Sequence, residues 1–126
     1  MAAPDALACR EMGSALREFE AARSSRDEMR LREAAEKAWL AVVDATNYHL
    51  AREGVTVEPG VKGHAQRRKA LIANEEIEVY NRYAVFREDL HGEAFYGGDL
   101  GPPGYLARRI EDARNYVVEM TGCEVA

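Results

Sequence analysis

The sequence has no long hydrophobic run. None of its apolar stretches approaches the roughly 18 residues that a membrane-spanning helix needs. The N-terminal segment carries acidic residues where a signal peptide would carry a basic segment and an apolar run. We therefore expect a cytoplasmic protein that does not cross a membrane.

The sequence also has no excess of positive charge. It contains 17 Lys and Arg against 22 Asp and Glu, which gives a formal charge of −5. Indiscriminate coating of nucleic acid needs a surplus of basic residues on one surface, so the charge balance excludes that class of protein and leaves a local basic site open.

Cysteine is scarce. Cys9 and Cys123 stand near opposite ends of the chain, and two cysteines do not make the dense disulfide framework of a small secreted domain. We expect two free thiols in an intracellular protein.

The motifs of several common enzyme classes are absent, since there is no P-loop, GxGxxG or GxSxG pattern.

His49, His64 and His91 could gather around a metal with Glu36 or Glu93, but no HExxH or CxxC spacing supports such a site. We therefore expect neither a metal nor another cofactor. The alternative roles are a hydrogen-bonded core histidine for His49 and a helix cap or solvent contact for His64.

What the sequence does contain is apolar spacing typical of helices, with steps of three and four residues that place one stripe on each helix. Asp5 is placed to cap the first helix, Gly54 to end the second, Asn74 to open the fourth and Pro103 to open the last. The predicted helices cover residues 5–24, 28–54, 64–73, 74–95 and 103–120.

No long Val, Ile and Thr alternation indicates a strand. Four long helices and one short helix predict an all-α fold, an antiparallel up-and-down helical bundle that forms a single domain over residues 1–126.

One face of the fourth predicted helix carries residues suited to phosphate chemistry. Arg87 and His91 are four residues apart, so their side chains meet on one face, together with Tyr80 and Ala84. The guanidinium keeps its charge at every accessible pH, whereas the imidazole titrates near neutrality. Arg87 could hold a phosphate and stabilise developing charge, and His91 could move a proton.

The alternative for this pair is structural. Arg87 could pair with Glu88, Asp89 or Glu33, and His91 could form a hydrogen bond near the helix end. The main basic clusters nearby are Arg67, Arg68 and Lys69 in the short helix and Arg108 and Arg109 in the last one, and part of the first cluster is expected to be ordinary solvated surface.

Four features of the chain resemble the PaREP1 family of HEPN-like helical proteins. They are the segment EAAEKAWLAVVDATNYHLA (33–51), His64 at the head of a short helix, the segment LHGEAFYGG (90–98) and the terminal amphipathic helix. The similarity runs from about residue 10 to residue 120. Its most specific pieces are AEKAW (35–39) and the LHxxxFY pattern that ends in Phe95 and Tyr96.

The resemblance implies a bundle that often dimerises, with the Arg/His helix near the dimer interface. Many HEPN domains are metal-independent ribonucleases, and others bind nucleotides as partners of small nucleotidyltransferases. The ribonuclease motif of the group places four to six residues between its Arg and its His. Here three residues separate Arg87 from His91 and eight separate Arg82 from His91, so neither pair matches.

We therefore predict first a HEPN-like homodimer that binds a nucleotide or a protein partner. The alternative is a metal-independent endoribonuclease of toxin or defence type, with Arg87 and His91 as catalytic residues and Tyr96 orienting the substrate or stacking on a base. The predicted ligand-binding residues are His49, His64, Arg82 and Phe95. The predicted partners are RNA or a nucleotide, and a nucleotidyltransferase.

Overall fold

The computed structural model describes residues 4–58 and 61–125, with side chains placed from residue 6 on and again from residue 62 on. Over these residues the chain forms α-helices and one π-helix without any strand, which confirms the predicted all-α class. The elements are α1 (Pro4–Ser25), α2 (Glu28–Arg52), α3 (Val61–Ala73), α4 (Ile77–Phe86), the π-helix η1 (Arg87–Tyr96) and α5 (Tyr105–Thr121). None of the described helices has the length and apolar character to cross a membrane.

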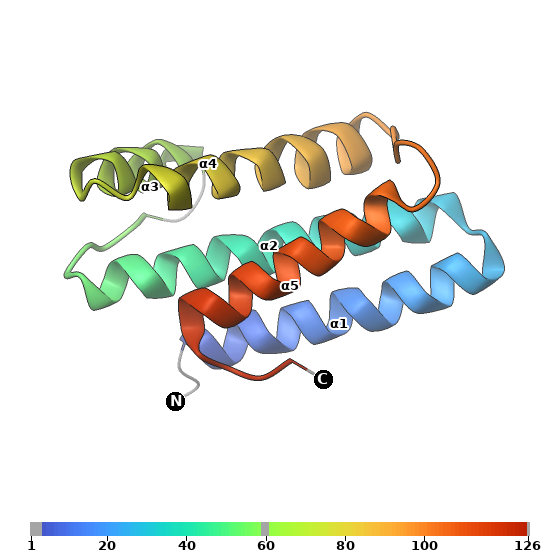
Figure 1. The fold of residues 1–126 in the computed structure, drawn as a ribbon, viewed down its shortest axis with the longest axis horizontal. Coiled ribbons are helices and arrows are strands. Elements are labelled where there is room, and N and C mark those ends of the chain that lie inside the picture. The colour runs from blue at the N-terminus through green and yellow to red at the C-terminus, as the bar shows by residue number, and fades with distance from the viewer. Residues whose placement is uncertain (1–3, 59–60, 126) are drawn as a thin grey trace.

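Helix α2 is the centre of the fold, because it contacts each of the other helical elements. In Figure 1, α4 and η1 run along one side of α2, α1 lies along the other, and α5 crosses in front. Many of the buried side chains of α1 and α2, two helices that pack against each other, are alanines, and such small side chains allow helix backbones to approach closely. These alanines are Ala8, Ala15, Ala34, Ala38 and Ala45.

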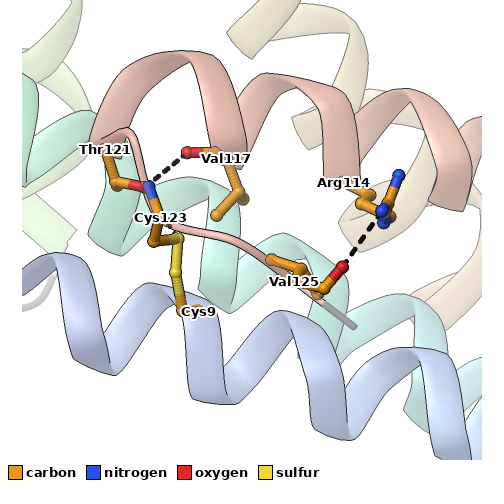
Figure 2. The surroundings of a disulfide bond; sticks show 6 residues. All are labelled: Cys9, Arg114, Val117, Thr121, Cys123 and Val125. Carbon is orange, nitrogen blue, oxygen red and sulfur yellow. Dashed lines mark hydrogen bonds between the residues drawn. A yellow bond between two sulfur atoms is a disulfide. The ribbon is translucent and has the colours of Figure 1, made fainter.

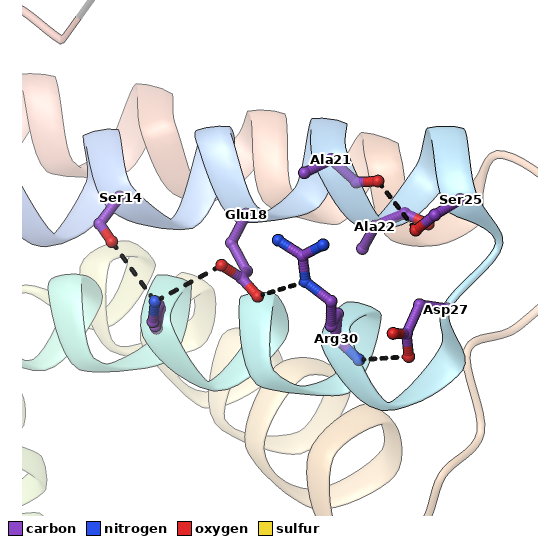
Figure 3. Close-up of polar contacts among 8 residues, drawn as sticks. Ser14, Glu18, Ala21, Ala22, Ser25, Asp27 and Arg30 are labelled. Atoms are coloured by element: carbon purple, nitrogen blue, oxygen red, sulfur yellow. Dashed lines mark hydrogen bonds and ion pairs between the residues drawn. The ribbon is translucent and has the colours of Figure 1, made fainter.

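A short turn joins α1 to α2, and polar contacts fix its geometry (Figure 3). Asp27 caps α2 by accepting a hydrogen bond from the backbone N–H of Arg30 at 3.2 Å. Nε of Arg30 also donates to Glu18 across the hairpin at 3.0 Å, and Nζ of Lys37 lies 3.8 Å from the same carboxylate. These ion pairs are partly exposed, so they orient the two helices more than they stabilise them.

Two predicted helix starts are wrong. Asn74 does not open α4, because residues 74–76 form a turn in which Glu75 has φ +61° and the backbone N–H of Asn74 still bonds to Ala70 of α3. Pro103 does not open α5 either, because Gly104 adopts φ +83° and the helix begins at Tyr105.

The other predicted ends lie close to the observed ones. Helix α1 begins at Pro4, so Asp5 lies inside its first turn instead of before it, and the side chain of Asp5 is outside the described residues. Helix α2 ends at Arg52, two residues before Gly54, which turns the chain with φ +84°.

The predicted fourth helix changes type in its middle. From Arg87 the backbone adopts the wider π-helical spacing, in which each N–H bonds to the carbonyl five residues earlier, as Gly97 does to Gly92 at 2.8 Å. The buried stripe of α4 and η1 consists of Tyr83, Phe86, Leu90 and Ala94. The stripe with Arg87 and His91 therefore lies at the edge of the core.

The glycine pair after η1 has a steric explanation. A Cβ on Gly97 would lie 2.8 Å from the carbonyl oxygen of Glu93, and Gly98 has φ +69°. The guanidinium of Arg32, on α2, donates to the carbonyl oxygen of Phe95 at 2.6 and 3.0 Å. This contact fixes the last turn of η1 to the central helix.

The expectation of two free thiols is wrong. Cys9 on α1 and Cys123 after α5 form a disulfide, with their Cα atoms 6.4 Å apart, and no free cysteine remains among the described residues (Figure 2). The two cysteines meet because α5 packs against α1. Arg114 holds the same C-terminal segment by donating to the carbonyl oxygen of Val125 at 3.0 Å.

Replacing Cys9 and Cys123 together by alanine should lower the free energy of unfolding by about 2–4 kcal/mol, because a link across 114 residues restricts the unfolded chain. Urea unfolding of the oxidised protein and of this double variant measures the difference. Equal unfolding midpoints, or two titratable thiols in the native oxidised protein, would contradict the link.

Candidate functional site

A hollow of about 390 Å³ opens where the start of α3 faces the junction of α4 and η1. Its polar lining includes His64 on α3 and Arg87 and His91 on η1. The remaining lining residues are Tyr80, Ala84, Glu88 and Gly92. The fold thus brings two predicted catalytic residues together with one predicted ligand-binding residue.

His91 is oriented by the central helix. Its Nδ1 lies 2.8 Å from Oε1 of Glu36, and its ring lies 5.7 Å from the ring of Trp39. A carboxylate can only accept, so Nδ1 carries a hydrogen and donates it to Glu36. In the neutral imidazole, Nε2 of His91 is therefore the nitrogen that can accept a proton.

His64 is oriented by Tyr83. The Tyr83 side chain is fully buried, and its hydroxyl oxygen accepts a hydrogen bond from Nε of Arg67 at 2.8 Å. Among the described residues, the acceptor within reach of the hydroxyl hydrogen is Nδ1 of His64 at 2.9 Å, and a buried hydroxyl rarely leaves its hydrogen unused. Neutral His64 then carries its hydrogen on Nε2, so it is a donor where His91 is an acceptor.

The neutral form of His64 is favoured by its surroundings. Burial lowers the pKa of its imidazole below the ordinary value, and the positive charges of Arg87, Arg67 and Arg68 lower this pKa further. No carboxylate contributes to this shift. The charged groups that shift this pKa are thus all arginines, although the chain as a whole is acidic.

Arg87 lies exposed beside the hollow, and its guanidinium has no ion pair or hydrogen bond with any residue that the structure describes. The alternative pairing with Asp89 is not observed, because Asp89 accepts a hydrogen bond from the hydroxyl of Tyr105 at 2.7 Å and lies 3.8 Å from Arg109. The charge of Arg87 is thus available to a ligand.

Arg67 is a buried cation with neutral partners. It is only 7% exposed, and besides Tyr83 it donates to the side-chain oxygen of Asn47 at 3.3 Å. A buried charge is usually paired with an opposite charge, and this one has no carboxylate partner among the described residues. It adds to the positive potential around His64.

Two aromatic residues extend the site beyond the hollow. The ring of Tyr96 lies 4.9 Å from the ring of His91 in an edge-on arrangement, and the Tyr96 side chain is 68% exposed. Phe95, which is half-buried, lies 5.0 Å from Tyr96. Both predicted residues therefore lie next to the hollow without lining it.

The other two predicted ligand-binding residues lie elsewhere. His49 contacts Glu76 and Glu53 near the C-terminal end of α2. Arg82 pairs with Glu119 of α5 and lines a separate hollow between α4 and α5. The packing of the helices separates both residues from the hollow that Arg87 and His91 line.

Sequence reasoning did not assign three residues that build the site. Glu36 was considered only as a metal ligand, Arg67 only as part of a basic cluster that could form a nucleic-acid groove beside Arg87, and Tyr83 was not a candidate. A signal existed for Arg67, because it lies three residues after His64 and so shares its helix face. No sequence signal identifies the partners of Glu36 and Tyr83, which lie on other helices.

The pKa of His64 should be measurable by NMR titration of its imidazole, and it should lie below the ordinary value of 6.5. Arg87→Ala should raise this pKa toward the ordinary value, because it removes a neighbouring positive charge. Arg108→Ala is the control, since Arg108 does not contribute to the shift. A wild-type pKa of 6.5 or above would contradict the described surroundings of His64.

Comparison with known proteins finds no protein family, no curated protein and no solved structure that matches this chain. The HEPN-like identity therefore stays a prediction, and the function is argued from the hollow and the residues around it.

Proposed function

We propose that the hollow beside His64, Arg87 and His91 binds a phosphate group of a nucleotide or of RNA, in a HEPN-like antiparallel bundle that works as a homodimer. The observation that carries this proposal is the guanidinium of Arg87, which lines the hollow together with His64 and His91 and has no ion pair or hydrogen bond with any described residue. A planar guanidinium can donate two parallel hydrogen bonds to phosphate oxygens, which makes arginine the preferred residue for this group.

The two histidines complement a phosphate that is attached to a sugar. Nε2–H of His64 donates to a phosphate oxygen, and Nε2 of His91 accepts from a hydroxyl group, as the hydrogen-bond networks of the two rings assign them. A ribose hydroxyl next to a phosphate offers this pair of groups, and it distinguishes RNA from DNA.

The exposed ring of Tyr96 supports the same ligand class. It lies against His91 and beside Phe95, so a base attached to the bound phosphate could stack on it. Stacking on aromatic side chains is the usual way in which proteins hold unpaired bases.

Arg87→Ala should weaken the binding of a short fluorescent single-stranded RNA by about tenfold or more, because a hydrogen bond to a charged group contributes about 1.5–3 kcal/mol. Fluorescence polarisation at low and high salt measures the change. Arg82→Ala is the matched control, since it removes an arginine of the neighbouring helix that already pairs with Glu119. Equal losses in both variants would assign the binding to overall charge, and the proposal would fail.

A second candidate function is metal-independent cleavage of RNA. The observation that favours it is the carboxylate of Glu36 on Nδ1 of His91, which orients the ring and leaves Nε2 as the nitrogen that can accept a proton. His91 would take the proton from a ribose 2′-hydroxyl as its oxygen bonds to the phosphorus atom. The 5′-oxygen leaves and takes up a proton, giving a cyclic phosphate, while Arg87 and His64 stabilise the charge on the phosphate oxygens.

Cleavage of single-stranded RNA with chelator present tests this candidate. His91→Ala should lower the rate by about a hundredfold or more, which is the usual contribution of a general base, and Glu36→Gln should lower it less. Arg82→Ala should keep the wild-type rate. Cleavage that persists in purified His91→Ala protein would show that another nuclease, or another residue, is responsible.

The remaining parts of the proposal rest on the resemblance. A homodimer is supported by the exposed side chains of Ile77 and Val85 on α4, which are 48% and 42% accessible. A nucleotidyltransferase partner has no support beyond the resemblance. A cytoplasmic location is opposed by the Cys9–Cys123 disulfide, because cytosolic proteins usually keep their thiols reduced.

A further inference from the structure

A second cluster of ionisable side chains lies toward the C-terminal end of α2, about 20 Å along the helix from Glu36. Nε2 of His49 is 2.5 Å from Oε2 of Glu76 and 3.6 Å from Oε1 of Glu53. One potential ligand atom from each of the three residues lies within 4.8 Å of the others. The cluster belongs to neither the hollow nor its lining.

The fold builds this cluster from two separate segments. His49 lies in the last turn of α2 and Glu53 is the residue that follows this helix, four positions later, so their side chains lie close together. Glu76 comes from the turn between α3 and α4, where it precedes the first residue of α4. Asn74 of the same turn donates from its side-chain amide to Oε1 of Glu53 at 3.1 Å, which fixes the orientation of that carboxylate.

The cluster has no Lys or Arg partner among the described residues. Two carboxylates lie around one imidazole. In addition, Oε1 of Glu76 is buried and has no hydrogen-bond partner there. Burying a carboxylate oxygen without a hydrogen-bond donor costs free energy, and a bound cation would lower this cost by coordinating the oxygen.

We propose that His49, Glu53 and Glu76 bind a divalent transition-metal cation, with Zn²⁺ as the representative ion. One imidazole nitrogen and two carboxylate oxygens form a donor set that zinc uses, and three protein ligands leave a fourth position for water. Bonds of about 2.0–2.2 Å in a tetrahedral site place the ligand atoms about 3.3–3.6 Å apart. Nε2 of His49 is 2.5 Å from Glu76 and 3.6 Å from Glu53, and all three ligand atoms lie within 4.8 Å of one another, so metal binding would replace the His49–Glu76 hydrogen bond and shift the side chains to this spacing.

The metal would connect the turn between α3 and α4 to the end of α2. It therefore stabilises the position of α3, which carries His64 and Arg67, without touching a ligand in the hollow. The sequence did not predict this site because its carboxylates come from Glu53 and Glu76, and their spacing from His49 matches no metal motif. The inference is independent of the proposed phosphate binding.

Titration of the chelator-treated, disulfide-bonded protein with Zn²⁺ tests the proposal. We expect one ion per chain by calorimetry and a higher thermal unfolding midpoint with Zn²⁺ than without it, because a ligand that binds the folded state stabilises it. Glu53→Gln and Glu76→Gln should each weaken binding by about tenfold or more. The visible absorption of bound Co²⁺ gives a second readout that reports tetrahedral coordination.

Glu36→Gln is the matched control. It changes the other His–Glu pair of the protein, His91–Glu36, which has a single carboxylate at 2.8 Å. Zn²⁺ binding should be the same in this variant as in the wild type. The proposal is overturned if Zn²⁺ leaves the unfolding midpoint unchanged, or if Glu36→Gln weakens binding as much as Glu76→Gln does.

Discussion

The buried hydroxyl of Tyr83 is the contact on which the candidate site depends. It accepts from Arg67 and donates to His64, and both of those residues belong to α3, whereas Tyr83 belongs to α4. The ring of Tyr83 packs 5.2 Å from Trp39 of the central helix. One side chain thus fixes α3 and α4 relative to α2, and it sets the hydrogen position of the imidazole that lines the hollow.

The same packing connects the two histidines of the site. The rings of His64, Tyr83, Trp39 and His91 follow one another at centroid distances of 5.7, 5.2 and 5.7 Å. Each such pair contributes about 0.5–1.5 kcal/mol beyond the burial of its surface. The histidines are therefore held by a continuous aromatic layer, and a ligand meets a preformed arrangement.

The fold class could be predicted from the sequence because apolar residues recur every three or four positions along most of the chain. The errors at Asn74 and Pro103 arose where the residue types suit a helix start but the backbone adopts a positive φ one residue later. The change to a π-helix at Arg87 could not be predicted, since apolar spacing differs little between the two helix types over ten residues.

Within the candidate site, the sequence could predict only those residues that share one face of a helix. Arg87 and His91 are four residues apart on one chain segment, and the structure places both at one hollow. Glu36 and Tyr83 act through contacts between helices, which a single sequence does not reveal. The Cys9–Cys123 disulfide could not be predicted for the same reason, because 114 residues separate the two cysteines and only the packing of α5 on α1 brings them together.

Binding at the hollow is the central claim, and the three histidines of the chain allow a direct measurement. A nucleoside monophosphate is titrated into protein with ¹⁵N-labelled histidine side chains, with chelator present, while the imidazole signals are followed by NMR. The account predicts saturable shifts for His64 and His91 and none for His49, which lies outside the hollow. Unchanged signals of His64 and His91, or equal shifts of all three, would contradict it.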